Sequence, residues 1–274
     1  MKEVIELNQH RLLCGDATNK EDVDLLIGDC KVNLLLTDPP YGIDIVNVDK
    51  ERESIWNNWR SETSNIQQGT VGTPAKPGFH KERERERELL KAKSENPGIV
   101  KPRMYYPIAN DDKPFHPYHL LALNLPSILF GANNYSDELP RNSKWLVWYK
   151  KEKLDSKKNN FSDVELMWTN LKGKACYLYH HSWSGMVRAG NRKEELKERV
   201  HPTQKPVGLY CELLEDFTQE GDTVLDLYGG SGSLLIACEK MGRRCLMMEL
   251  SPHYCDVIQK RYWDYVGKGQ SKLL

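Results

Sequence analysis

The chain has 274 residues, of which 39% are hydrophobic and 28% are charged, and its formal net charge at pH 7 is +0. A chain of this length can bury a sizeable core, and one domain with an insertion is the simplest organisation. The balanced charge excludes a uniformly basic nucleic-acid-binding protein, so any contact with DNA has to come from local positive patches.

The cysteines and the apolar runs indicate the cellular compartment that we expect for the protein. The 7 cysteines are odd in number and include no Cys-x-x-Cys spacing, so neither a disulfide framework nor a zinc site is expected. The amino terminus lacks the apolar core of a signal peptide, and no apolar run approaches membrane-spanning length. We therefore expect a reduced cytoplasmic protein with no bound metal and no membrane contact.

The first predicted elements form a β-α-β unit. A strand over 11–14 is followed by a helix that starts at a capping box, Thr18–Glu21, and ends near Ile27. A second strand then ends at Asp38. Asp16 would lie at the carboxyl end of the first strand, beside Asp38, where an aspartate most often caps a turn or a helix.

The second strand ends in an unusual way. An apolar run stops at the sequence TDPPYG, residues 37–42, and the run predicts a strand buried on both faces of a parallel sheet. Pro39 and Pro40 end the strand because neither donates a backbone N–H. The Asp38 side chain and the Pro39 carbonyl thus become two fixed acceptors at a ligand-binding edge. Two such acceptors suit an –NH2 group, and the Tyr41 ring offers a flat face to a planar base.

Residues 43–115 differ in character from the rest of the chain. They show little apolar periodicity and include the alternating charge run Lys81–Glu88, which is typical of a solvated helix or a mobile linker. A stretch of this length predicts an insertion within the domain, either a functional lid or a partly disordered segment. Because it begins directly after Tyr41, it could close over a bound base.

Order resumes with a short helix over about 119–125 and three strands, at 127–130, 144–149 and 164–168.

A positive surface is expected between residues 141 and 199, where basic residues outnumber acidic ones. The candidates for contacts with phosphates and bases are Lys150, Lys151, Lys172, Lys174, His181, Trp183 and Arg188. Each of these residues taken alone is more often a packing or surface residue. His180 and His181 have no partner at metal-ligand spacing, which again predicts no metal site.

The last third of the chain contains a glycine loop. The hexapeptide HPTQKP at 201–206 precedes an amphipathic helix that ends by Gly221. The sequence DTVLDLYGGSGS at 222–233 then predicts a strand, a loop and a helix, and its glycines let the backbone approach a ligand closely. The third glycine of a dinucleotide fingerprint would fall at Leu235, so the loop suits a nucleoside-type ligand without a pyrophosphate. Asp226, just before the loop, is placed to bind a cationic amine.

A further acid follows the glycine loop. The strand over 245–248 ends at Glu249, about twenty residues past the glycines, which is the spacing at which a carboxylate reaches ribose hydroxyls. Ser251 and Pro252 then begin a last helix that runs to about Tyr265.

Several of these motifs together resemble one family. The motif at 38–41 is similar to the catalytic motif of amino-methylating DNA methyltransferases, which methylate adenine N6 or cytosine N4. The hexapeptide at 201–206 and the glycine loop resemble the cofactor motifs of this family, and their position after the catalytic motif is similar to its beta group. The resemblance implies an α/β, Rossmann-like fold with a mostly parallel seven-stranded sheet, an antiparallel hairpin and three layers.

The resemblance also implies S-adenosylmethionine as the cofactor. In the family, an acid at the position of Asp16 binds the cofactor's adenine amino group, and the polar residues of the hexapeptide contact its methionine end. Tyr228 supplies an aromatic ring where the family often has phenylalanine. The expected cofactor contacts are Asp16, Asp38, Thr203, Gln204, Lys205, Asp226, Tyr228, Gly229, Gly230, Ser231, Gly232 and Glu249.

Adenine in double-stranded DNA, flipped out of the helix, is the expected substrate. Asp38 favours adenine because the resembled cytosine-N4 enzymes commonly carry serine there. Cytosine N4, RNA adenine and an inactive cofactor-binding partner subunit are the alternatives, and a generic Rossmann oxidoreductase is disfavoured by the glycine loop. The chain has no Pro-Cys dipeptide, which excludes cytosine C5 chemistry resembling the known family.

The expected setting is a bacterial or phage restriction–modification system, with a homodimer as a candidate assembly. Residues 171–200 lie where the beta group often carries its target-recognition domain. Such a short segment predicts limited sequence specificity.

Overall fold

The computed structural model describes residues 2–42, 108–141, 144–151, 162–184, 187–188, 200–201 and 203–270. All of them belong to one compact unit. Most of the predicted insertion, residues 43–107, lies outside the described residues. The described residues on its two sides meet, since the backbone N–H of Gly42 donates to Asp111 Oδ1 at 3.2 Å.

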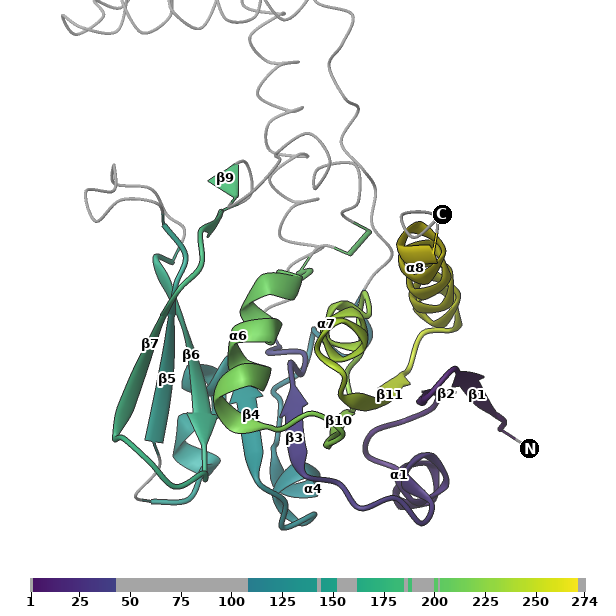
Figure 1. Cartoon of the computed structure of the whole chain (residues 1–274). Coiled ribbons are helices and arrows are strands. Elements are labelled where there is room, and N and C mark those ends of the chain that lie inside the picture. The colour runs from purple at the N-terminus through teal and green to yellow at the C-terminus, as the bar shows by residue number, and fades with distance from the viewer. Residues whose placement is uncertain are drawn as a thin grey trace, which may run out of the picture. The chain divides into compact units, whose positions relative to one another are not determined.

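A nine-stranded mixed sheet forms the centre of this unit (Figure 1). Its order is β1-β2-β11-β10-β3-β4-β6-β5-β7. The strands are β1 (Val4–Leu7), β2 (His10–Cys14), β3 (Leu34–Thr37), β4 (Ser127–Phe130), β5 (Lys144–Tyr149), β6 (Val164–Thr169), β7 (Cys176–His180), β10 (Thr223–Asp226) and β11 (Arg244–Glu249). β2, β11, β10, β3 and β4 pair in parallel, and β6 runs antiparallel to both β4 and β5. The predicted parallel sheet with an antiparallel hairpin is confirmed.

Two strands at the edges of the sheet were not predicted. β1 pairs antiparallel with β2, and β7 pairs parallel with β5, so the sheet has nine strands instead of seven. Both are edge strands that pair on one side only, and each contains exposed residues that interrupt an apolar run, such as Glu6 in β1 and His180 in β7. In β7 the inward residue Tyr179 is buried while Leu178 is exposed. A second, two-stranded sheet joins β8 (Trp183–Ser184) and β9 (Val187–Arg188).

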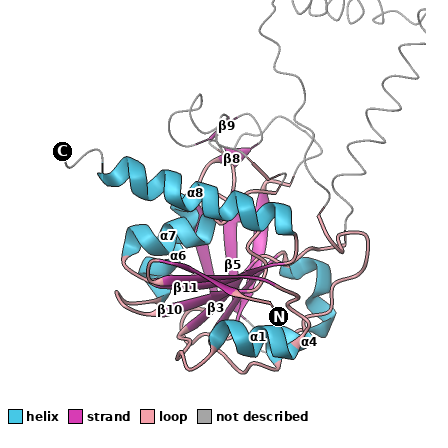
Figure 2. Cartoon of the chain, turned by 90° about the vertical axis from the view of Figure 1, so that its right-hand side faces the viewer, coloured by secondary structure: helices cyan, strands magenta, loops and turns pink. Residues whose placement is uncertain are grey.

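Helices cover both faces of the main sheet, which gives the predicted three layers (Figures 1 and 2). One face carries α1 (Lys20–Ile27), α4 (Tyr118–Leu121) and the 3-10 segment η2 (Ala132–Glu138); the other carries α6 (Val207–Phe217), α7 (Ser233–Met241) and α8 (Pro252–Gln270). The alternation of side chains along β3 separates the two cores. Leu34 and Leu36 pack with α6, α7 and α8, whereas Leu35 packs with α1 and α4. None of the helices in the described ranges combines the length and the apolarity needed to span a membrane.

The start of α1 differs from the predicted capping box. Asn19 is the N-cap, and its side chain accepts from the backbone N–H groups of Glu21 and Asp22. Thr18 instead donates to Asp16, so the predicted cap was one residue early. Gly28 ends the helix as expected, with φ of 54°.

Candidate active site

The carboxyl ends of β2, β3, β10 and β11 face one cavity of about 480 Å³. Because parallel strands share a direction, the residues that follow each strand meet at the same edge of the sheet. Most of the predicted site residues line this cavity: Asp16, Asp38, Pro39, Pro40, Tyr41, Thr203, Gln204, Lys205, Tyr228, Gly229, Gly230, Ser231 and Glu249. Asp226 and Gly232 are not among the lining residues.

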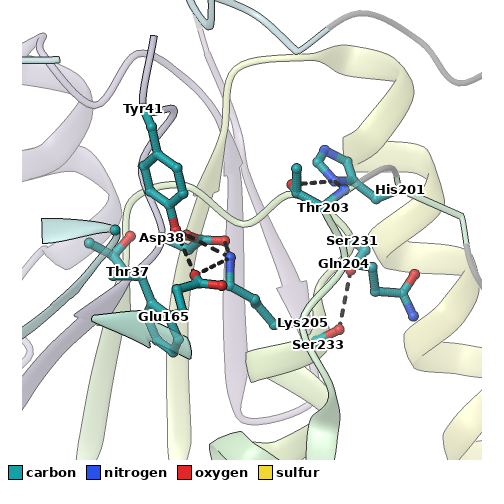
Figure 3. Close-up of polar contacts among 12 residues, drawn as sticks. Thr37, Asp38, Tyr41, Glu165, His201, Thr203, Gln204, Lys205, Ser231 and Ser233 are labelled. Atoms are coloured by element: carbon teal, nitrogen blue, oxygen red, sulfur yellow. Dashed lines mark hydrogen bonds and ion pairs between the residues drawn. The ribbon is translucent and has the colours of Figure 1, made fainter. Parts of the chain in front are cut away.

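Four polar side chains form a cluster at the Asp38 end of the cavity (Figure 3). The Tyr41 hydroxyl donates to Asp38 Oδ1 and also lies 2.9 Å from Glu165 Oε1. Lys205 Nζ forms an ion pair with Asp38 Oδ2 and lies 3.0 Å from Glu165 Oε1. Lys205, which was expected to contact the cofactor, thus directly contacts Asp38 and Tyr41 of the motif at 38–41.

The cluster is largely withdrawn from water, which changes the proton affinities of its members. Burial raises the pKa of Asp38 against the opposing effect of Lys205, and Glu165 adds to the increase. Burial alone would lower the pKa of Lys205, but the two carboxylates outweigh it and the pKa is raised. Burial also opposes ionisation of Glu165, yet Lys205 and Lys150 hold its pKa below the ordinary value. Burial raises the pKa of Tyr41 well above its usual range, so this phenol remains a donor.

The backbone of Gly131 fixes the Tyr41 ring. Gly131 follows β4 with φ of +63°, and a Cβ atom there would lie 2.0 Å from Tyr41 Cε1. The ring therefore needs the absence of a side chain at this position. Its hydroxyl points into the cluster (Figure 3), which holds the Asp38 carboxylate in one orientation.

The glycine loop and Glu249 form the other end of the cavity. Glu249 Oε2 accepts from the backbone N–H of Gly230 at 2.8 Å, and Oε1 accepts from that of Ser251 at 2.9 Å. The loop is also held from α8, since Arg261 donates to the Ser231 carbonyl. The acid that the sequence places about twenty residues after the glycines thus lies against them.

Two roles were considered for Asp16, namely capping of a turn and contact with the cofactor. Its Oδ1 accepts from the backbone N–H of Thr18 at 2.9 Å and from the Thr18 hydroxyl at 2.7 Å, which is a turn-capping arrangement. Asp16 also lines the cavity.

Asp226 connects β10 to β3. Its Oδ1 accepts from the Thr37 hydroxyl at 2.7 Å and from the backbone N–H of Tyr228 at 3.1 Å. Burial raises its pKa from 3.8 to about 7. The recorded contacts of Asp226 position the Asp38 strand and the glycine loop; binding of a cationic amine by this residue stays a prediction.

Replacing Asp226 by asparagine should change how stability depends on pH. The folded protein retains a proton on Asp226 between pH 3.8 and about 7, whereas the unfolded chain loses it near pH 4. The stability contributed by this group is therefore present below pH 4 and lost as the pH rises through 7. Asparagine keeps a carbonyl acceptor for Thr37 and Tyr228 without the titration.

Urea unfolding from pH 4 to pH 8 measures this effect. The free energy of unfolding of the Asp226→Asn variant should rise relative to wild type by about 1–4 kcal/mol over that range. Parallel pH curves for the two proteins would contradict the assignment.

The cavity has an aromatic wall that sequence reasoning missed. His119 Nε2 lies 2.8 Å from the Tyr228 hydroxyl, and the Phe115 ring packs edge-on against Tyr228 with centroids 5.9 Å apart. The missed lining residues include Phe115, His119, His201 and Tyr254, and Glu165 was missed in the polar cluster. His201 belongs to the HPTQKP hexapeptide, which could have revealed it. The others carry no local signal, because the fold brings them in from distant segments.

The predicted nucleic-acid residues divide between the two ends of the sheet. Lys150 and Lys151 follow β5, at the end where β6 begins with Val164 and Glu165. His181 and Trp183 follow β7 at that same end. Lys172 and Lys174 lie in the turn between β6 and β7, at the opposite end. The side chain of Arg188 lies outside the described residues.

The four residues at the Glu165 end of the sheet also form contacts within the protein. Lys150 Nζ lies 3.5 Å from Glu165 Oε2, Lys151 pairs with Asp163, and His181 Nδ1 lies 3.2 Å from Glu212 Oε1. The Trp183 indole donates to the Gln204 carbonyl at 3.1 Å. Within the described ranges, no group of three or more His, Cys, Asp or Glu residues is arranged to hold a metal ion.

Comparisons with known proteins agree with the motifs. A family model described as DNA methylase, N6_N4_Mtase, matches residues 96–260. The type II methyltransferase M2.DpnII of Streptococcus pneumoniae is 29% identical over 116 residues, which is 42% of this chain and 40% of that protein. The type II methyltransferase M.HpaI of Haemophilus parainfluenzae is 36% identical over 63 residues, which is 23% of this chain and 20% of that protein.

These alignments span less than half of the curated relatives' own length. Among solved structures, the M1.HpyAVI–SAM complex is similar with 16% identity and a TM-score of 0.43, over 91% of this chain and 97% of that chain.

Proposed function

The chain belongs to the N6/N4 DNA methylase family, and from this premise we propose that it transfers the methyl group of S-adenosylmethionine to adenine N6 in double-stranded DNA. The observation that carries the proposal is that one cavity joins Glu249 and the glycine loop to the Asp38–Pro39 edge. A nucleoside-type methyl donor at one end thereby faces an acceptor site for an amino group at the other.

The residues at the Glu249 end fit the cofactor. Glu249 is oriented by two backbone N–H groups and can accept from ribose hydroxyls. Gly230 leaves room for close approach of the nucleoside, since the atom nearest to a Cβ placed there is His201 Nε2 at 3.7 Å. Gly229, Asp16 and the Tyr228 ring line the same space. Thr203 and Gln204 are the candidates for the methionine end. When bound, S-adenosylmethionine supplies an electrophilic methyl group on a sulfonium.

The residues at the Asp38 end fit an exocyclic amino group. Asp38 and the Pro39 carbonyl accept its two N–H bonds, which favours a pyramidal nitrogen whose lone pair is available for attack. The new N–C bond forms as the S–C bond breaks, and the nitrogen becomes cationic. Asp38 then takes the proton, which it could not remove efficiently from a neutral amine. Positioning and fixed electrostatics provide most of the rate increase, because no covalent enzyme intermediate is needed.

The target base reaches Asp38 only outside the double helix. Lys150, Lys151, His181 and Trp183 follow β5 and β7 at the same end of the sheet as Glu165, and they are the proposed contacts for the flanking strand. Lys172 and Lys174 lie at the far end, so that any contact they make with nucleic acid would need DNA that extends around the molecule.

The proposal is tested by incubating the protein with methyl-labelled S-adenosylmethionine and unmethylated DNA, and then identifying the modified nucleoside by mass spectrometry. N6-methyladenine is the expected product. N4-methylcytosine as the product would support the proposed site but show that the target base is cytosine. Labelled methyl groups found only in RNA would show that the substrate is RNA. Cofactor binding without product on either nucleic acid would contradict the proposed enzyme and favour a partner subunit.

Replacing Glu249 by alanine should weaken cofactor binding about 10- to 100-fold. The variant loses charged hydrogen bonds to the ribose, and it also frees the N–H groups of Gly230 and Ser251. Titration calorimetry with S-adenosylhomocysteine measures the dissociation constant. Glu215→Ala, an exposed residue of α6, is the matched control and should bind as wild type does. Equal cofactor affinities of the Glu249→Ala and Glu215→Ala variants would show that Glu249 does not bind the cofactor.

A further inference from the structure

A second carboxylate, which the proposed reaction does not use, lies beside the catalytic one. Glu165 comes from β6, and its Oε1 shares the Tyr41 hydroxyl with Asp38 Oδ1. The side chains of Asp38 and Glu165 are each only 15% exposed. Two buried carboxylates that share one hydroxyl group repel each other, and both stay ionised only if a positive charge lies beside them.

Lys205 provides that charge. Its ammonium group lies between the two acids, in ion pairs with Asp38 Oδ2 and with Glu165 Oε1, and its side chain is 8% exposed. The Lys205 ammonium also lies 5.6 Å from the centre of the Tyr41 ring and 5.3 Å from that of Phe130. An ammonium enclosed by two carboxylates and two aromatic faces is held in place.

We propose that Lys205 is the positioning residue that keeps Asp38 ionised for the reaction, and that Glu165 holds Lys205 in position. The inference rests on the proposed function, because it assigns how the amino-group acceptor is maintained in its reactive form. It also moves the main role of Lys205 from the cofactor's methionine end to the catalytic carboxylate.

Among the charged groups around Asp38 and Glu165, Lys205 is the one that pairs with Asp38. Lys150 contacts Glu165 Oε2 at 3.5 Å, and Lys205 is the only cation among the described residues with a recorded ion pair to Asp38. The other titratable groups that influence Asp38 or are influenced by it are Tyr41, Tyr135, Tyr210 and Asp226. None of these four groups is a cation at neutral pH. Without the Lys205 charge, the negative charge of Asp38 is therefore neutralised by binding a proton.

The test compares single-turnover methylation rates from pH 5.5 to pH 9 for four proteins. They are wild type, Lys205→Met, Lys205→Arg and the double variant Lys205→Met/Glu165→Gln. In Lys205→Met the acid limb of the profile should move up by about one pH unit or more, which corresponds to about a tenfold loss of rate on that limb. Lys205→Arg keeps the charge and should keep the limb near wild type. The double variant removes the neighbouring negative charge and should move the limb part of the way back.

A readout independent of activity locates the proton. Infrared spectra at pH 7 of protein labelled with ¹³C-aspartate should show more protonated carboxyl in Lys205→Met than in wild type, and this increase should be absent from Lys205→Met/Asp38→Asn. The carboxyl of Asp226, whose pKa is about 7, contributes to the spectra of all three proteins and is removed by taking differences. The same spectra with ¹³C-glutamate should show no such proton on Glu165, since Lys150 still contacts that side chain.

The outcomes are distinct. A uniform loss of rate at every pH, or a proton found on Glu165, would overturn the inference. A rise of tenfold or more in the cofactor dissociation constant of Lys205→Met, with an unmoved acid limb, would overturn it in favour of cofactor binding. A wild-type protein that methylates no nucleic acid, but whose variants show the infrared change, would remove the proposed function and leave the charge assignment standing.

Discussion

Replacing Asp38 by alanine should lower the single-turnover rate of methyl transfer at least about a hundredfold, while the dissociation constant for S-adenosylmethionine changes by less than about threefold. Asp38 is the charged acceptor in the proposed reaction and the proposed proton acceptor after it. The groups expected to bind most of the cofactor lie at the other end of the cavity, around Glu249 and Gly230. The effect should therefore appear in the chemical step.

Two further variants sharpen this test. Asp38→Asn keeps an oxygen acceptor but has no negative charge, so it should resemble the alanine variant if the charge matters. Asp29→Ala, an exposed aspartate in the turn after α1, is the control and should react as wild type does. Methylation by Asp38→Ala at a rate close to wild type would show that another group binds the amino nitrogen.

Replacing Gly131 by alanine should reduce methyl transfer at least about tenfold, although Gly131 itself is not expected to contact substrate. The new Cβ atom would lie 2.0 Å from Tyr41 Cε1, so the ring has to move. That movement withdraws the Tyr41 hydroxyl from Asp38 and Glu165 and misaligns the acceptor, and small misplacements of reacting groups are costly.

Gly221→Ala is the matched control for backbone strain. Gly221 also has a positive φ, of +84°, but nothing lies within 4 Å of a Cβ atom placed there. Each variant should lose about 1–3 kcal/mol of stability from the strained backbone conformation, as measured by urea unfolding. Only Gly131→Ala should lose activity beyond its loss of folded protein. Equal activities of the two folded variants would show that the Tyr41 position is not critical.

The sequence predicted those parts of the fold that depend on local patterns. The strands at 127–130 and 144–149 have the predicted bounds, and the helix 233–241 follows the glycine loop as expected. Their signals are continuous apolar runs and turn residues, which act within a few positions of the chain. β1 and β7 were missed because exposed residues interrupt their apolar pattern, for example Glu6 in β1 and His180 in β7.

The candidate site was predictable where it follows the ends of parallel strands. Asp38 and Glu249 were expected at one edge because each comes directly after an apolar run, and both line the same cavity. Glu165 was not predicted, since its contact with Tyr41 spans 124 positions of the chain and depends on the direction of β6. The same direction places Lys172 at the far end of the sheet, although it is only seven positions after Glu165.

A crystal structure of the protein with S-adenosylmethionine tests the central claim most directly, because the claim is that one cavity brings the methyl donor to the Asp38–Pro39 edge. The account predicts ribose hydroxyls within hydrogen-bonding distance of Glu249 and a sulfonium methyl that faces the space beside Asp38 and the Pro39 carbonyl. A cofactor bound outside this cavity, or one whose methyl group points away from Asp38, would contradict it.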